Sequence, residues 1–252
     1  MGDIRVERQQ GNVAVVTVSA PETRNALTPE MGRQLDDVCD DLDRDQHLGA
    51  VVVRGEGGTF CSGADTRTWD VNADPASDEA FVRTSATYGA FARVGTLRVP
   101  TIAAVRGAAV GAGINLALAT DLRIVATDVR LLAGFLRIGI HPGGGFFTLA
   151  GRLGGRETAA ALGLFSQEIS GERAVALGLA WEAHPDAEVE PRALELARAA
   201  GSDPELARRA VSSFRTELGP PGTSWPAALE LERGVQMWSQ RRRATDAGQA
   251  GT

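Results

Sequence analysis

The stretch that most constrains the fold is residues 107–125, which read GAAVGAGINLALATDLRIV. An apolar run at residues 101–105 precedes it and is typical of a buried strand. After a turn of small residues, residues 114–120 carry few polar side chains and suit a buried helix, and residues 121–127 read as another strand. The sequence therefore predicts a strand, a glycine-rich turn and a helix start, which together present free backbone N–H groups to an anion.

The glycines of this turn leave other interpretations open. A dinucleotide site also joins a strand to a helix through glycines, but its pattern is G-x-G-x-x-G with an acidic residue about twenty positions further on. Here the spacing is G-x-x-x-G-x-G from Gly107 to Gly113, and only Asp128 stands near the acidic position. The glycines could also serve close packing of helix and strand alone.

Three more segments accompany this one, in a fixed order. They are PETRNAL at residues 21–27, AVVVRGEGGTFCSGAD at residues 50–65 and IGIHPGGG at residues 138–145. In order and spacing, the four segments resemble the crotonase family, also called the enoyl-CoA hydratase/isomerase superfamily. The resemblance covers residues 6–189 and is looser beyond them. It implies an α/β fold, a spiral of ββα turns, with a core over residues 1–190 and a helical region over 191–252 used for trimerisation.

Composition excludes several classes of function. The net charge is −6 and the pI about 5.2, which argues against a nucleic-acid partner. All 26 basic residues are arginines, and chemistry through a lysine Schiff base is therefore excluded. Two cysteines, Cys39 and Cys61, make no disulfide framework. Because no signal sequence and no run of about eighteen apolar residues occurs, we expect a cytoplasmic protein without membrane contact.

The pattern of apolar residues predicts the order of the elements. We expect a strand pair at residues 4–8 and 13–19, a helix from Thr28 and Pro29, a short strand at 50–53, and a helix at 79–98 after a polar loop at 66–78. This alternation up to about residue 150 implies a mostly parallel sheet. Further helices are expected at residues 156–164, 170–177, 192–200, 204–218 and 226–239.

The resemblance implies an oxyanion hole made of two backbone N–H groups, those of Ala64 and Ala112, which donate hydrogen bonds to the thioester oxygen of an acyl-CoA. Removing one such donor typically costs roughly 2.7–4 kcal/mol in the transition state. Coenzyme A enters as part of the substrate, and neither a separate cofactor nor a metal is implied. The positions that correspond to substrate contacts are Arg24, Ala26, Ser62, Gly63, Gly113, Phe135 and Ile140.

The acid and base positions depart from the family pattern. Hydratases of the family use two glutamates, and the corresponding positions here are Asn115 and Phe135. A positioned acid or base contributes roughly 10²- to 10⁴-fold, so we expect weak or absent hydration. Isomerase relatives keep only the second glutamate, which Phe135 also replaces, and the aspartate nucleophile of dehalogenase-like relatives corresponds to Gly143.

Three polar residues remain as catalytic candidates beside the oxyanion hole. His141 could accept a proton near neutral pH, in a setting that the apolar Phe135 would help to bury, or it could be a helix-capping or partly exposed histidine before Pro142. Asn115 could orient a water or an acyl carbonyl but cannot transfer a proton. Asp65 follows Ala64 and could be catalytic or structural.

Other polar groups receive structural interpretations. Ser62, His141 and Asp65 could imitate a Ser-His-Asp set, but the G-x-S-x-G pattern is absent. The only tyrosine, Tyr88, lies on an apolar helix face and is expected in the core. His47 and His184 are expected to be isolated on the surface.

Three hypotheses follow for the function. The leading one is an acyl-CoA-processing enzyme with an atypical reaction through the oxyanion hole, assembled as a homotrimer or a dimer of trimers. The second is a non-catalytic acyl-CoA carrier of the same fold, which the loss of both glutamates favours. The third is a nucleotide-binding α/β domain, which the glycine spacing disfavours.

Overall fold

The computed structural model describes residues 2–68 and 78–218. Its larger sheet has the strand order β1-β2-β3-β4-β6-β9. The strands are β1 (Asp3–Gln9), β2 (Val13–Ser19), β3 (Ala50–Gly55), β4 (Thr101–Val105), β6 (Leu122–Ala126) and β9 (Glu182–His184). Only β1 runs antiparallel to its neighbour. The expected strand pair at the start and the mostly parallel sheet are therefore confirmed.

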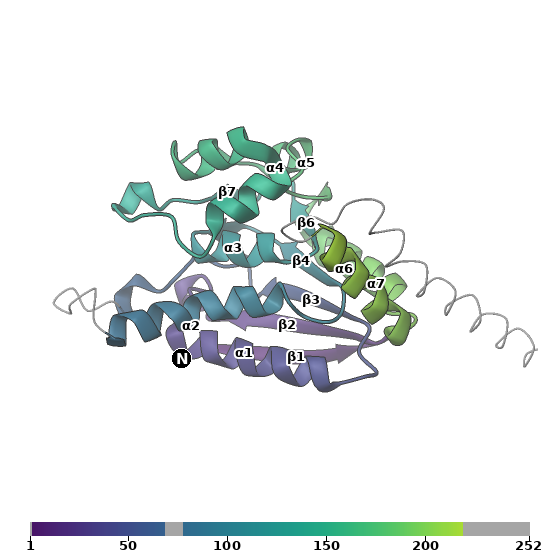
Figure 1. The fold of residues 1–252 in the computed structure, drawn as a ribbon. Coiled ribbons are helices and arrows are strands. Elements are labelled where there is room, and N and C mark those ends of the chain that lie inside the picture. Colours follow the sequence, from purple (N-terminus) through teal and green to yellow (C-terminus); the bar gives the residue numbers. More distant parts are fainter. Residues whose placement is uncertain (1, 69–77, 219–252) are drawn as a thin grey trace, which may run out of the picture.

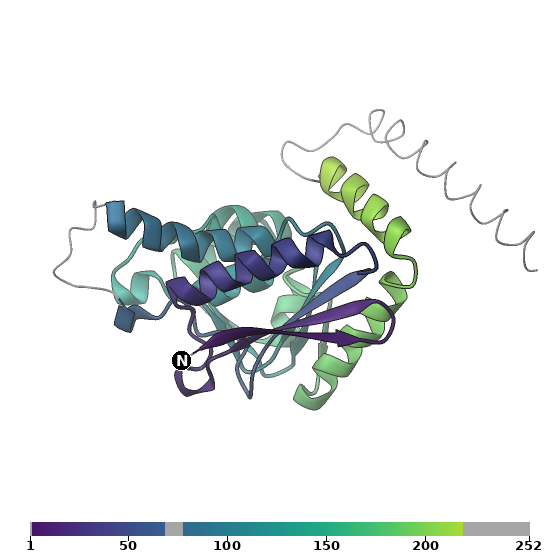
Figure 2. The same ribbon diagram turned by 90° about the horizontal axis from the view of Figure 1, so that it is seen from below.

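The helices α1 (Pro29–Arg44) and α2 (Asp78–Val94) lie side by side along the sheet (Figures 1 and 2). Thr28 caps α1 as expected, because its hydroxyl oxygen accepts a hydrogen bond from the N–H of Met31 at 3.2 Å. Leu35 and Leu42 lie buried on the inner face of α1, at the spacing of a helix that covers a core.

A smaller sheet brings distant loops together. Its strands are β5 (Ala108–Val110), β7 (Arg130–Leu132) and β8 (Glu168–Ile169). Two parallel bridges extend it, one between Cys61 and Ala109 and one between Leu27 and Ala64. The loops that follow β2 and β3 therefore lie beside β5, directly before α3 (Ala112–Ala119).

Short 3₁₀ turns and further helices complete the fold. The turns are η1 (Pro21–Thr23), η2 (Thr66–Thr68) and η3 (Leu136–Ile138). The later helices are α4 (Phe146–Gly163), α5 (Gly171–Ala176), α6 (Asp186–Ala200) and α7 (Pro204–Leu218). Gly155, with φ 79°, bends α4, and the helix expected at 156–164 is only its second half. The helix expected at 226–239 and most of the expected polar loop lie outside the described residues.

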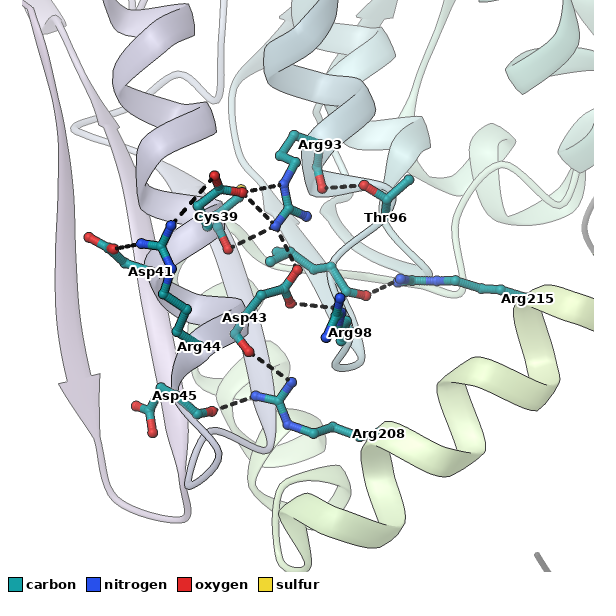
Figure 3. A network of polar contacts seen from close by, with 12 residues as sticks. Cys39, Asp41, Asp43, Arg44, Asp45, Arg93, Thr96, Arg98, Arg208 and Arg215 are labelled. Atoms are coloured by element: carbon teal, nitrogen blue, oxygen red, sulfur yellow. Dashed lines mark hydrogen bonds and ion pairs between the residues drawn. The ribbon is translucent and has the colours of Figure 1, made fainter. Parts of the chain in front are cut away.

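The last two described helices, α6 and α7, pack against the core. The helix α6 packs across β3, β4 and β6, and the expected division between residues 190 and 191 falls inside it. Arg208 on α7 donates to the main-chain carbonyl of Asp45, and the carboxylate of Asp43 accepts hydrogen bonds from Arg93 at 2.6 Å and from the N–H of Arg98 at 2.8 Å (Figure 3). These contacts join the end of α1 to α7, to the end of α2 and to the segment before β4. Within residues 2–68 and 78–218, no helix is both long and apolar enough to cross a membrane.

Candidate active site

A cavity of about 830 Å³ opens where the loops after β2, β3 and β5 meet α2 and the segment between β7 and α4. Its wall contains nearly every residue that the sequence pointed to. These are Arg24, Ala26, Ser62, Gly63, Ala64, Asp65, Ala112, Asn115, Phe135, Ile140 and His141. Gly113 lies behind the wall, against Cys61.

The N–H of Ala64 is turned away from the neighbouring chain segment. In the parallel bridge, the N–H of Leu27 donates to the carbonyl of Gly63 and the N–H of Asp65 donates to the carbonyl of Leu27, both at 2.8 Å. Ala64 lies between these two bonds, so its own N–H faces the other side, where no described residue offers it an acceptor.

The N–H of Ala112 is free for a different reason. Ala112 is the first residue of α3, and the first N–H groups of a helix have no partner within it. The two loops approach closely, because a Cβ placed on Gly63 would lie 3.7 Å from the backbone nitrogen of Ala112. A Cβ on Gly113 would lie 2.2 Å from the carbonyl oxygen of Cys61, so only glycine permits this packing.

Together these features form a candidate anion-binding corner. Two N–H groups from adjacent loops face the cavity, and one of them lies at the positive end of the α3 dipole. Such fixed donors stabilise negative charge that develops on a carbonyl oxygen, and they need no reorganisation during the reaction.

Asn115 is a structural link within the wall. Its side chain is buried, and its Nδ2 donates to the carbonyl of Gly143 at 2.9 Å. Its Oδ1 is buried and has no partner among the described residues. The amide therefore holds the turn of residues 139–145 against α3, and it provides neither an acid nor a base.

Phe135 supplies an apolar surface in place of a carboxylate. Its ring packs edge to face on Phe146, with a centroid distance of 5.7 Å. Its carbonyl accepts the N–H of Ile140 at 3.1 Å, which places Ile140 in the same wall. No proton-transfer group stands at this position.

His141 and Asp65 lie in surroundings that favour the non-catalytic alternative for each. His141 is exposed rather than buried, and its Nδ1 lies 2.7 Å from the carbonyl of Pro142. The carboxylate of Asp65 is buried and accepts two hydrogen bonds from the side chain of Arg67, at 2.9 and 2.7 Å, and one from its backbone N–H at 3.0 Å. The hydrogen bonds from Arg67 hold the pKa of Asp65 below its usual value. The carboxylate of Asp65 is therefore ionised and already hydrogen-bonded to Arg67.

No Ser-His-Asp set is assembled. The hydroxyl of Ser62 donates to the carbonyl of Thr23 at 2.9 Å instead of to a histidine. Nearby, burial raises the pKa of the Cys61 thiol to about 12, so a thiolate nucleophile is disfavoured.

Arg24 is exposed beside Ser62, with φ 55°, and its carbonyl accepts the N–H of Ser62. Its guanidinium stays available to an anionic part of a ligand.

Two interpretations from the sequence are corrected here. Tyr88 is 41% exposed and lines the cavity instead of the core. Periodicity identified its apolar helix face, but α2 turns that face partly toward the cavity. His184 is not isolated, because it lies 2.8 Å from Glu182. The pairing of Arg67 with Asp65 was also missed, and only their two-residue spacing hinted at it.

Comparison with known proteins gives one consistent result. Residues 8–243 match the model of the family described as enoyl-CoA hydratase/isomerase. A probable enoyl-CoA hydratase of Mycobacterium tuberculosis is 39% identical, over 88% of this chain and 83% of its own length. The 1,2-epoxyphenylacetyl-CoA isomerase of Escherichia coli is 29% identical, over 91% and 87%. The crystal structure of an enoyl-CoA hydratase from Polaromonas sp. JS666 superposes with a TM-score of 0.87, at 26% identity, and covers 99% of this chain and 96% of its own.

Proposed function

Because the chain belongs to the enoyl-CoA hydratase/isomerase family, we propose that it binds an acyl-CoA thioester in the 830 Å³ cavity and polarises the thioester carbonyl with the N–H groups of Ala64 and Ala112. The observation that carries the proposal is a pair of backbone N–H groups, on two touching loops, that form no hydrogen bond within residues 2–68 and 78–218. The exposed Arg24 on the same wall provides a positive charge for the phosphates of coenzyme A.

The reaction that follows polarisation is one other than ordinary water addition. Hydration needs a group that delivers a proton and a group that activates water, and Asn115 and Phe135 offer neither. Asp65 is held by Arg67. Thioester hydrolysis, decarboxylation and an atypical isomerisation all place negative charge on the same oxygen, and they are the reaction classes that this cavity favours.

A second function, a non-catalytic acyl-CoA carrier, draws on a specific observation. The polar side chains nearest the oxyanion hole are engaged within the protein, since Asn115 is bonded to Gly143 and Asp65 to Arg67. A carrier would keep the anion-binding corner and have no need of proton transfer.

Ligand identification tests the function. Mass spectrometry of the purified protein identifies any acyl-CoA that copurifies, and incubation with that compound shows whether it is converted. Calorimetry with butyryl-CoA, S-butyl-CoA and NAD then measures specificity. We expect butyryl-CoA to bind more tightly than S-butyl-CoA, which lacks the carbonyl oxygen, and we expect no binding of NAD. Binding of NAD without binding of any acyl-CoA would reject the proposal.

Crotonyl-CoA tests the reaction class. We expect its hydration to be far slower than the ordinary enzyme median of about 10 s⁻¹, because both carboxylate positions are occupied by Asn115 and Phe135. Turnover at that median rate would show that other residues perform the acid and base steps.

A further inference from the structure

Tyr88 presents to the cavity a hydroxyl group that forms no hydrogen bond with any residue that the structure describes. Its ring is anchored by Phe91, with a centroid distance of 5.8 Å, and Phe91 itself is buried. Tyr88 is nevertheless 41% exposed and lies in the cavity wall. Among the residues that the structure describes, none forms a hydrogen bond with its phenol oxygen.

The facing turn is shaped around this phenol. A Cβ placed on Gly143 would lie 2.0 Å from the hydroxyl oxygen of Tyr88, and a Cβ on Gly144 would lie 2.3 Å from the ring of Phe91. The phenol oxygen therefore takes the space that a side chain at position 143 would need. A residue other than glycine there would displace the tyrosine.

This hydroxyl lies close to the oxyanion corner. Asn115 is three residues after Ala112 on α3, which places both on one helix face about one turn apart. The amide of Asn115 bonds to the carbonyl of Gly143 at 2.9 Å, and Gly143 contacts Tyr88. A group bound at Ala112 therefore has Tyr88 within reach of the next few atoms of an acyl chain.

Two acceptors of the described wall already have donors of their own. The carbonyl of Gly143 already accepts from Asn115, and the carboxylate of Asp65 is engaged by Arg67. Phe91 and Phe135 contribute only apolar surface to the cavity. A saturated acyl chain would displace water from the phenol hydroxyl without replacing the hydrogen bond to that water. The loss of this hydrogen bond would disfavour binding of such a chain.

We propose that Tyr88 is a specificity-determining residue that donates a hydrogen bond to a second oxygen on the acyl group, one or two carbons beyond the thioester carbonyl. The ligand class is then an acyl-CoA that carries a ketone or a carboxylate on its acyl chain. This inference rests on the proposed acyl-CoA function.

Calorimetry with three thioesters tests the inference. Butyryl-CoA has no second oxygen, acetoacetyl-CoA has a ketone and malonyl-CoA has a carboxylate. In Tyr88→Phe we expect affinity for at least one of the oxygen-bearing compounds to fall, by about 3- to 10-fold for the ketone and by more for the carboxylate. Affinity for butyryl-CoA should stay within about twofold. The compound that loses more identifies the acceptor.

The matched control is Thr23→Val. Thr23 also lines the cavity, but its hydroxyl already donates to the carbonyl of Ala20 at 3.1 Å. Loss of that hydroxyl should change the affinities for the three thioesters equally, if it changes them at all.

Because Tyr88 is the only tyrosine, labelling with 3-fluorotyrosine gives a single ¹⁹F resonance. We expect this resonance to shift more with the preferred oxygen-bearing thioester than with butyryl-CoA.

The outcomes separate the two proposals. Binding of all three thioesters with the same loss, or no loss, in Tyr88→Phe would overturn the role of Tyr88 and leave the acyl-CoA function intact. Failure of all three to bind the wild-type protein would reject both.

Discussion

Proline at position 112 would delete one of the two proposed oxyanion donors at little cost to the fold. Ala112 is the first residue of α3, and its N–H makes no hydrogen bond with a described residue. Proline is favoured at the first position of a helix. The preceding residue is Gly111, with φ 55° and ψ −117°, and it lacks the Cβ that a following proline ring would strike. We therefore expect the unfolding free energy of Ala112→Pro to change by no more than about 1 kcal/mol.

The effect on ligands should be large by comparison. One neutral hydrogen bond contributes about 0.5–1.5 kcal/mol, so affinity for butyryl-CoA should fall about 2- to 12-fold. Affinity for S-butyl-CoA should be unchanged, because this thioether lacks the thioester carbonyl oxygen that the donor would bind. If a turned-over substrate is found, kcat should fall about 10²- to 10³-fold.

Calorimetry gives the two affinities, and difference infrared spectroscopy with ¹³C=O-labelled butyryl-CoA reports polarisation of the carbonyl directly. The carbonyl band should shift to lower frequency in the wild-type complex and less in Ala112→Pro. Ala112→Ser keeps the N–H and serves as the control. The reasoning would be refuted if Ala112→Pro bound butyryl-CoA with wild-type affinity and gave an undiminished shift.

Three further predictions address other parts of the molecule. His141→Ala should lower turnover of a substrate about 10²-fold with little change in affinity if His141 transfers protons; a rate within twofold of wild type would remove it as a candidate. The protein should assemble as a trimer or a dimer of trimers, as measured by light scattering at micromolar concentration, and a monomeric mass would contradict this. Hydrogen bonds from Arg192 and His184 lower the pKa of Glu182 to about 2. The ionised Glu182 therefore stabilises the fold above its unfolded pKa, and this stabilisation is lost as pH falls through about 4.5 toward 2. In chemical denaturation, the unfolding free energy of Glu182→Gln should fall less steeply with decreasing pH than that of the wild type.

Local sequence signals predicted much of this molecule. The apolar run at residues 101–105 and the small residues after it led to β4 and α3, because a buried strand and a tight turn leave strong patterns. Thr28 and Pro29 marked the start of α1 for an equally local reason, the needs of a helix end.

Features that depend on distant contacts were not predictable in the same way. Periodicity assigns Tyr88 to an apolar face of α2, but whether that face meets core or cavity depends on where the turn of Gly143 lies. The pairing of Asp65 with Arg67 depends on the 3₁₀ turn η2 that places them together. The exposure of His141 likewise follows from the turn that carries it.

The two donors that we propose for the oxyanion corner belong to the main chain, and this affects how the site can be found. A scan that replaces each side chain with alanine would leave Ala64 and Ala112 as they are and would report nothing there. The substitutions that do register would be at Gly63 and Gly113, where any Cβ meets a neighbouring backbone oxygen, and they would look like folding defects. Replacing an amide by an ester at position 64 or 112 would remove the N–H alone and expose the function directly.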